Sequence, residues 1–299
     1  MLFEEFILRV RACIGIGLAT EFKIYQFIKQ NKRVPNLNDF IQIMDGKYAI
    51  ASDVYMRIFS KKTTELLQQT LAFSKYITIF DQAYPAKLRE IYHPPLVLFY
   101  RGNLELLQRK ALAVVGARQH SSYSHEVLQG LIPPIVQNKI ITISGLAQGV
   151  DSLCHRLTIN SGGDTVGVIG TGMNRVYPRC NQELQYEMMQ NHLVISEYVY
   201  DEEPRAWHFP ERNRIIAGLC DSLMVTEAKE RSGSLITANL ALQENRNVLA
   251  VPGKINAALS RGCNLLIREG AKPVLESRNI YAWKHRSNPQ SHYYQCSEC

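Results

Sequence analysis

Glycine, hydroxyl-bearing and basic residues follow most of the short apolar segments in the second half of the chain. Glycine lets backbone N–H groups come close to an anion, and arginine or lysine adds charge-assisted contacts. Where such a residue precedes a helix, the positive end of the helix dipole also favours negative charge. The pattern predicts a phosphate-binding site formed by these positions: Gly116, Arg118, Ser144, Gly145, Gly149, Gly170, Gly172, Arg179, Asn181, Ser232, Gly233, Ser234 and Lys254.

The glycine spacing does not fit two common nucleotide-binding motifs. After Gly170-Thr171-Gly172, Arg175 stands where the dinucleotide fingerprint has its third glycine. The sequence also contains no GxxxxGK segment followed by Ser or Thr, which ATP-hydrolysing P-loops require. We therefore expect neither of these nucleotide sites, no cofactor and no catalytic residues.

Two arginines flank an asparagine in the segment FPERNRIIAGL, residues 209–219. Arg212 and Arg214 stand at the start of an expected amphipathic helix, where they could contact phosphates. Alternatively, they could pair with Glu197, Glu211 or Glu227 and hold the adjoining loops in place. Both interpretations stay open from the sequence.

Asp151 and His155 are four residues apart on an expected helix, a spacing that brings side chains together. They could form an acid–base pair, but helix capping with a local hydrogen bond is the simpler interpretation. Glu197 and Glu227 each follow an expected strand, without a nucleophile or metal ligands beside them. Two carboxylates at strand ends could also suggest a glycosidase, but nothing beside them supports that chemistry.

Tyr177 and His208 are aromatic candidates for stacking on a base. Tyr177 could equally form a wall of the pocket, and His208 could pack against the helix that contains the two arginines.

Six short apolar segments, each bounded by Gly, Ser or Asn, alternate with stretches of helical pattern. Buried parallel strands read as continuous apolar runs because helices cover both faces of their sheet. The fold class predicted is therefore α/β, an extended Rossmann-like, doubly wound and mostly parallel sheet. The expected strands are 111–116, 140–144, 165–170, 193–196, 222–226 and 247–251.

The chain divides into four segments. Residues 1–72 show helical spacing and predict a small all-α domain; residues 73–110 form a connector that leads into the sheet. Residues 111–275 form the Rossmann-like domain, and residues 276–299 form a polar tail. Within the first domain, Ile14-Gly15-Ile16-Gly17 could be the turn of a helix-hairpin-helix or an ordinary tight turn, which is the simpler interpretation.

Composition narrows the class of protein. The 299 residues are 46% hydrophobic and 20% charged, and the net charge of +7 favours an anionic partner. Seven irregularly spaced cysteines indicate reduced thiols, and Cys296 with Cys299 cannot complete a tetrahedral zinc site. The sequence lacks a secretory h-region and a membrane-length apolar run, so we expect a cytoplasmic protein without a membrane partner.

The segments GLAQGVDSLCH, VIGTGMNRVYPRCNQEL, FPERNRIIAGL, EAKERSGSLITA, VPG and GCNLLIREGA resemble, in this order, the signature segments of the DprA/Smf family. The resemblance covers about residues 76–275 and implies an extended Rossmann-like fold. It also implies that Arg118 and Arg179 hold a DNA backbone in a basic pocket, with the glycine, serine and asparagine positions above supplying further contacts. Ala117 departs from the Ser or Thr that members often have, and Arg179 stands where Lys is frequent.

The family resemblance also implies partners. Its members bind single-stranded DNA and load the recombinase RecA onto it in natural transformation, so RecA and single-strand-binding protein are expected partners. It further implies a homodimer and a SAM-like N-terminal domain. For the dimer surface we predict the helix from Cys263 to Glu269, with Leu265, Leu266 and Ile267.

A second function stays open. Nucleotide-binding Rossmann-like hydrolases related to phosphoribohydrolases cleave nucleotides with a glycine-rich phosphate loop. Their PGGxGTxxE pattern is not found here, since Pro252-Gly253 continues as Lys254-Ile255. Turnover of nucleoside monophosphates would distinguish such an enzyme from a DNA-binding protein.

Overall fold

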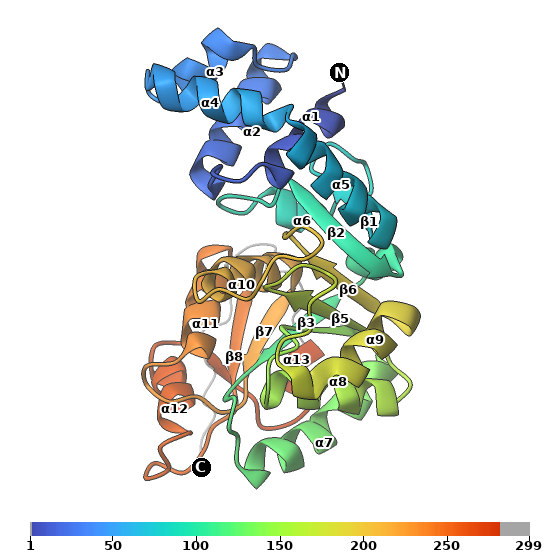
Figure 1. Cartoon of the computed structure of the whole chain (residues 1–299). Coiled ribbons are helices and arrows are strands. Elements are labelled where there is room, and N and C mark those ends of the chain that lie inside the picture. Colours follow the sequence, from blue (N-terminus) through green and yellow to red (C-terminus); the bar gives the residue numbers. More distant parts are fainter. Residues whose placement is uncertain (1, 282–299) are drawn as a thin grey trace, which may run out of the picture.

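A nine-stranded sheet forms the centre of the molecule in the computed structural model, which describes residues 2–281 (Figure 1). The order of its strands is β1-β2-β6-β5-β4-β3-β7-β8-β9. The six predicted strands are confirmed as β3 to β8. The bounds are β1 (Lys75–Thr78), β2 (Val97–Gly102), β3 (Ala111–Val115), β4 (Ile141–Ser144), β5 (Thr165–Ile169), β6 (Leu193–Ser196), β7 (Ser222–Val225), β8 (Asn247–Ala250) and β9 (Lys272–Pro273).

Helices cover both faces of the sheet, as a doubly wound fold requires. Alternate residues of β3 point to opposite faces. Leu112 and Val114 belong to a buried cluster with α7 (Ser122–Gln137) and α8 (Val150–Asn160). Ala113 and Val115 belong instead to the cluster that contains α10 (His208–Leu219) and α11 (Gly233–Gln243). The predicted α/β, Rossmann-like fold is therefore confirmed.

The predicted all-helical N-terminal region is also confirmed, and it lies beside the β1–β2 end of the sheet (Figure 1). Its apolar side chains are continuous with the sheet's main core: Phe6 and Ile58 are buried in the same cluster as Ile77 of β1. The helices are α1 (Phe3–Ala12), α2 (Leu18–Asn31), α3 (Leu37–Ile43), α4 (Tyr48–Ile58) and α5 (Lys61–Phe73). Its relation to SAM-like domains stays a prediction.

The expected connector does more than lead into the sheet, because it supplies two of the sheet's strands. Strand β2 pairs antiparallel with both β1 and β6, and this extends the parallel core towards the N-terminal helices. The connector also forms α6 (Ala86–Arg89) and the 3₁₀ helix η1 (Leu104–Gln108). The sequence showed only β2, because β1 is four residues long and half exposed.

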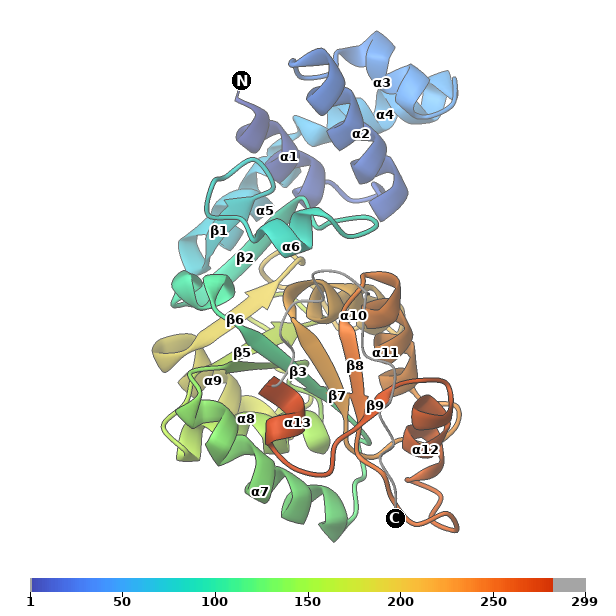
Figure 2. The same ribbon diagram turned by 180° about the vertical axis from the view of Figure 1, so that it is seen from behind.

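The boundary of the polar tail is also corrected. Helix α13 (Arg278–Tyr281) follows β9 (Figure 2). The side chain of Ile280 is fully buried in one cluster with residues of α7 and α8. The folded part of the chain therefore extends past residue 276. The remaining helices are α9 (Gln182–Asn191) and α12 (Arg261–Arg268), with the 3₁₀ helix η2 (Arg179–Asn181) preceding α9.

Across residues 2–281, no helix has both the length and the apolar character that crossing a bilayer demands. Nor do three His, Cys, Asp or Glu side chains converge as metal ligands within that range. Cys296 and Cys299, the pair weighed as a metal site, lie outside the described residues.

Candidate functional site

A cleft of about 660 Å³ opens at the carboxyl ends of β3 and β7. These two strands are parallel neighbours, but the chain leaves them towards opposite faces of the sheet. Strand β3 is followed by α7 on one face, and β7 is followed by α11 on the other. Loops that diverge in this way leave a crevice between them, which is where open α/β sheets bind ligands. The lining contains three arginines, Arg118, Arg205 and Arg212, and one carboxylate, Asp151.

Arg118 is an exposed cation in the lining of the cleft. Its guanidinium lies over the ring of Phe209, 5.9 Å from the ring centre. The ring of Tyr177 packs against the same phenylalanine, with 5.4 Å between the two ring centres. Within residues 2–281, no carboxylate lies within ion-pair distance of Arg118. An arginine that is positioned by an aromatic ring and lacks a carboxylate partner is available to an external anion.

Arg212 is buried at the floor of the cleft. Its guanidinium donates hydrogen bonds to the backbone oxygens of Gly145, at 2.5 Å, and Val168. Burial lowers the pKa of this guanidinium, and the nearby Asp151 carboxylate opposes that effect. Burial in turn raises the pKa of Asp151, which accepts a hydrogen bond from the Gly145 N–H. Arg212 therefore adds positive charge beneath the cleft while it ties the ends of β4 and β5 together.

The start of α11 forms the opposite wall. Ser232, Gly233 and Ser234 line the cleft, and an added Cβ on Gly233 would meet no atom within 4 Å. The Ser232 hydroxyl is buried and has no hydrogen-bond partner among residues 2–281. The Ser234 hydroxyl donates to the Gly116 oxygen at 2.8 Å, so it holds this wall against the β3 loop. The helix start thus presents small residues and its positive dipole end to the cleft.

Three predicted contact residues have internal partners instead. The Ser144 hydroxyl is fully buried and donates to the Val114 oxygen at 2.6 Å. The buried Asn181 amide donates to the oxygens of Leu146 and Ala147. We therefore correct the prediction for these two side chains: they shape the loop after β4, and contacts with DNA are no longer expected from them.

Arg214 is the third such residue, and the structure favours its anchoring interpretation. One of its terminal nitrogens lies 2.7 Å from each carboxylate oxygen of Glu197, and both side chains are buried. This residue is not part of the cleft lining. Glu227 has a comparable role, because it accepts hydrogen bonds from the backbone and hydroxyl of Ser121 and from the hydroxyl of Ser124.

Several glycines are required for close packing rather than for access to an anion. A Cβ on Gly145 would overlap the Arg212 guanidinium. A Cβ on Gly172 would overlap backbone oxygens of Val199 and Tyr200, and one on Gly116 would overlap Val150. Gly170 leaves room for the ring of Phe209 and so supports the cleft indirectly.

Replacing Gly149 with alanine is expected to destabilise the protein by about 1–3 kcal/mol. Gly149 has a φ of 89°, a conformation that other residues rarely adopt. Its Cβ would also overlap the backbone oxygens of Ala117 and Arg118, and so displace the loop that carries Arg118. Urea unfolding measures the loss. Gly233→Ala is the matched control, because space is open there; equal stability of the two variants would contradict the explanation.

Arg179 and Lys254 lie outside the lining of the cleft. Arg179 is exposed two residues after Tyr177, and Lys254 is exposed beyond β8. Phe209 and Arg205 line the cleft, although neither is among the residues predicted for the site. The signal for both was the alternation of basic and aromatic residues in the segment 205–209, RAWHF, which is typical of surfaces that bind single strands.

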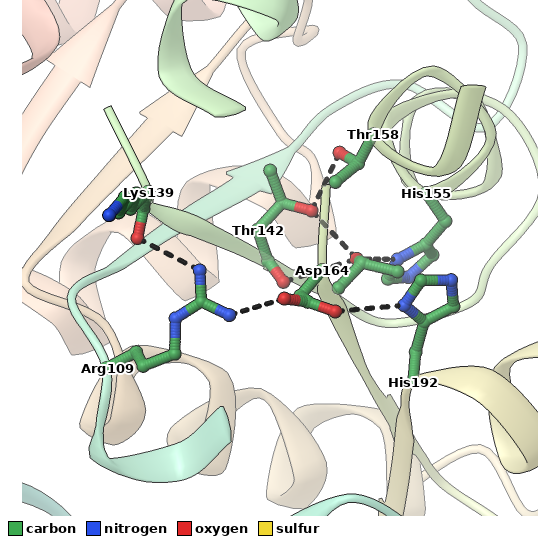
Figure 3. Close-up of polar contacts among 8 residues, drawn as sticks. Arg109, Lys139, Thr142, His155, Thr158, Asp164 and His192 are labelled. Carbon is green, nitrogen blue, oxygen red and sulfur yellow. Dashed lines mark hydrogen bonds and ion pairs between the residues drawn. The ribbon is translucent and has the colours of Figure 1, made fainter. Parts of the chain in front are cut away.

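Asp151 and His155 do not pair with each other, so the acid–base interpretation of their spacing is wrong. Asp151 lies in the first turn of α8 and makes a local hydrogen bond with the Gly145 N–H, as the simpler interpretation expects, but it does not cap the helix. Asp151 points to the cleft, whereas the His155 ring lies at the amino ends of the strands, where its Nδ1 is 2.6 Å from the Thr165 hydroxyl (Figure 3). His155 Nε2 is buried and has no hydrogen-bond partner in the described part of the chain. His192 and Asp164 lie beside it in Figure 3, with 3.6 Å between His192 Nδ1 and the carboxylate.

Acid is expected to destabilise the protein through His155. Burial lowers the pKa of this imidazole to about 3, below its value of about 6.5 in the unfolded chain. As pH falls from about 6.5 towards 3, His155 binds a proton in the unfolded chain but stays neutral in the folded protein. Stability then falls by up to about 1.4 kcal/mol per pH unit. Unfolding of wild type and His155→Gln between about pH 7 and pH 5 measures the effect: the variant is expected to show a smaller loss, and parallel curves would contradict the assignment.

Comparison with known proteins places these features in a family. A family model described as DNA recombination-mediator protein A matches residues 75–283. The DNA processing protein DprA of Streptococcus pneumoniae is 44% identical over 238 residues, which cover 78% of this chain and 81% of that protein. The DprA of Bacillus subtilis is 40% identical over 206 residues, 69% of each chain.

Two solved structures share the fold. The crystal structure of DprA from Streptococcus pneumoniae is similar with a TM-score of 0.86 and 37% identity, over 94% of this chain and 98% of that one. A structure of DprA from Helicobacter pylori is similar with a TM-score of 0.63 and 27% identity, over 69% of this chain and 94% of that one. Its description concerns the single-stranded DNA binding mode of that protein.

Proposed function

This chain belongs to the DprA/Smf family, and on that premise we propose that it is a recombination mediator that binds single-stranded DNA in the Arg118 cleft. The finer activities proposed are protection of incoming single strands in the cytoplasm and loading of RecA onto them in natural transformation. Single-strand-binding protein is a further proposed partner, because it binds the same single-stranded DNA.

The observation that carries the proposal is the exposed guanidinium of Arg118 at the topological switch point. It lies over Phe209 and faces the start of α11 across the cleft. Phosphate contacts supply affinity for any strand, and aromatic rings accept any base by stacking. The combination therefore suits a single strand without sequence preference.

Arg179, Lys254 and the Ser232-Gly233-Ser234 wall remain in the proposed interface. The wall lines the cleft itself. The two exposed cations lie on loops at the same edge of the sheet, where a strand longer than the cleft could reach them. Gly116 and Gly170 are proposed to support this surface by packing.

A homodimer is also proposed, with α12 as its surface. Leu265, Leu266 and Ile267 are half-buried on this short helix at the edge of the sheet beyond β8. Light scattering across a concentration series tests the oligomeric state. A monomer at all concentrations would overturn this part of the proposal.

A nucleotide hydrolase is the competing proposal, and one observation favours it. Asp151 lines the cleft with a pKa raised by burial, as a general acid would require. A structural role also explains Asp151, because its carboxylate accepts a hydrogen bond from Gly145 and interacts with the charge of Arg212. Turnover of nucleoside monophosphates by wild type, abolished in Asp151→Asn, would establish the hydrolase.

The direct test measures binding of the full chain to labelled oligo-dT by fluorescence anisotropy in a salt series. We expect the logarithm of the affinity to fall linearly with the logarithm of the salt concentration. The slope is expected to steepen by about 0.7 for each phosphate that the protein contacts in a single strand. RecA filament formation on strands covered by single-strand-binding protein then tests loading. Wild-type protein that fails to bind the oligonucleotide would overturn the proposed function.

A further inference from the structure

A second hollow of about 410 Å³ adjoins the cleft on the other side of Arg118. It is formed by the loops that follow β3 and β4, which pair in parallel, so their carboxyl ends lie side by side. Arg118 lines both this hollow and the main cleft. The main cleft opens between the β3 and β7 loops, and this hollow opens over the β3–β4 pair. A DNA strand that passes Arg118 would therefore run from the main cleft into this hollow.

The charges in the hollow suit a phosphate. Its lining contains Arg118, His120 and Arg156, together with the exposed amides of Gln119 and Gln148, and it contains no carboxylate. Arg156 is exposed, and no ion pair or hydrogen bond occupies it among the described residues. The guanidinium is therefore free to contact an anion at little conformational cost to the protein.

The position of Arg156 on α8 follows from helical spacing. Ser152 and Arg156 are four residues apart and lie on the same face of the helix, above one another. Ser152 adjoins Gly149, whose backbone contacts the Arg118 loop. One helical turn, a rise of about 5.4 Å, therefore separates Arg156 from the residues beside the Arg118 loop. Arg156 thus follows Arg118 along the surface.

The alternative exit from the cleft is much less suited to DNA. Arg205 connects the cleft to another cavity of about 410 Å³, between the α1–α2 turn and the loop after β6. Three carboxylates line that cavity, Asp201, Glu202 and Glu211. Its two arginines are already in ion pairs, Arg11 with Glu21 and Arg205 with Glu202. Negative side chains repel a phosphodiester backbone, so of these two cavities the one beside Arg156 offers a DNA strand the more favourable charge.

We propose that the hollow of Arg118, His120 and Arg156 is a second phosphodiester subsite, which continues the path of the single strand beyond the cleft. Arg156 contacts the backbone of nucleotides that lie outside the cleft itself. The inference rests on the proposed function, since it requires that single-stranded DNA occupies the cleft.

The test compares full-length wild type with Arg156→Ala and Arg156→Lys on oligo-dT of about four and about twelve nucleotides. On the longer strand we expect Arg156→Ala to weaken binding about three- to ten-fold and to reduce the salt slope by about 0.7. On the shorter strand, which fills only the cleft, we expect no change. Arg156→Lys is expected to recover most of the slope, because it keeps the charge.

Two control variants separate the possible failures. Arg118→Ala is expected to weaken binding of both strand lengths, and Lys110→Ala, an exposed cation at the opposite edge of the sheet, is expected to weaken neither. If Arg118→Ala weakens binding but Arg156→Ala leaves the longer strand unaffected, the subsite is overturned and the proposed function stands. Equal loss on both lengths, or an equal loss in Lys110→Ala, also overturns the subsite. Wild type that binds neither strand overturns the proposed function itself.

Discussion

Replacing Arg118 with alanine is expected to lower the affinity for single-stranded DNA by about ten- to a hundred-fold, since hydrogen bonds to charged groups contribute about 1.5–3 kcal/mol. The effect is large because Arg118 lines both the main cleft and the hollow that contains Arg156. The salt slope is expected to become shallower as a phosphate contact is lost. Fluorescence anisotropy across a salt series measures both quantities.

The design of this experiment separates binding from folding. Arg118 is exposed and makes no ion pair within residues 2–281, so the free energy of unfolding is expected to stay unchanged. Arg118→Lys is expected to fall between wild type and alanine, because lysine keeps the charge but cannot present a planar group to Phe209. Lys110→Ala controls for loss of overall charge. An Arg118→Ala variant that binds as tightly as wild type would show that the cleft is not the site.

Replacing Arg214 with methionine is expected to lower the free energy of unfolding by about 3–5 kcal/mol. The substitution leaves the carboxylate of Glu197 buried without its partner, and a side chain that is 1% exposed cannot recover hydration. A second buried pair in the same region, Arg11 with Glu21, lies at 2.9 Å and would be affected by any local rearrangement. Urea unfolding measures the loss.

Arg175→Met is the matched control for this prediction. It removes an arginine from a pair with Asp201 at 2.8 Å, in which both side chains are more than 40% exposed. Exposed pairs contribute about 0–1 kcal/mol, so little stability should be lost. The folded Arg214→Met protein is expected to bind single-stranded DNA like wild type. Unchanged stability with weakened binding would restore the interpretation of Arg214 as a DNA contact.

The difference between Arg212 and Arg214 illustrates why side-chain roles were harder to predict than elements. A helix turns about 100° per residue, so residues two apart point in directions about 200° apart. One arginine therefore reaches the Gly145 and Val168 oxygens at the cleft, and the other reaches Glu197 on the opposite side. The sequence placed both on one helix, but only the packing of α10 against the sheet decided which faced the cleft.

Edge strands were the least predictable part of the fold. Residues 75–78 and 272–273 are too short and too exposed to show the continuous apolar pattern of a central strand. Their pairing depends on neighbours that are distant in sequence, since β1 pairs with β2 and β9 pairs with β8. Long-range pairing of this kind leaves little trace in a local window of residues.

The sequence by itself determined the six central strands and the positions of the residues that follow them. Continuous apolar runs indicate strands covered on both faces, and glycine, hydroxyl-bearing and basic residues after most of these runs mark the loops at the carboxyl edge. Tertiary structure decided the strand order, and with it the divergence of the β3 and β7 loops that opens the cleft. It also decided that Ser144, Asn181 and Arg214 are held inside while Arg118 is left exposed. The physical reason is that a buried polar group must satisfy its hydrogen bonds with whichever groups the fold brings to it, and those groups come from distant parts of the chain.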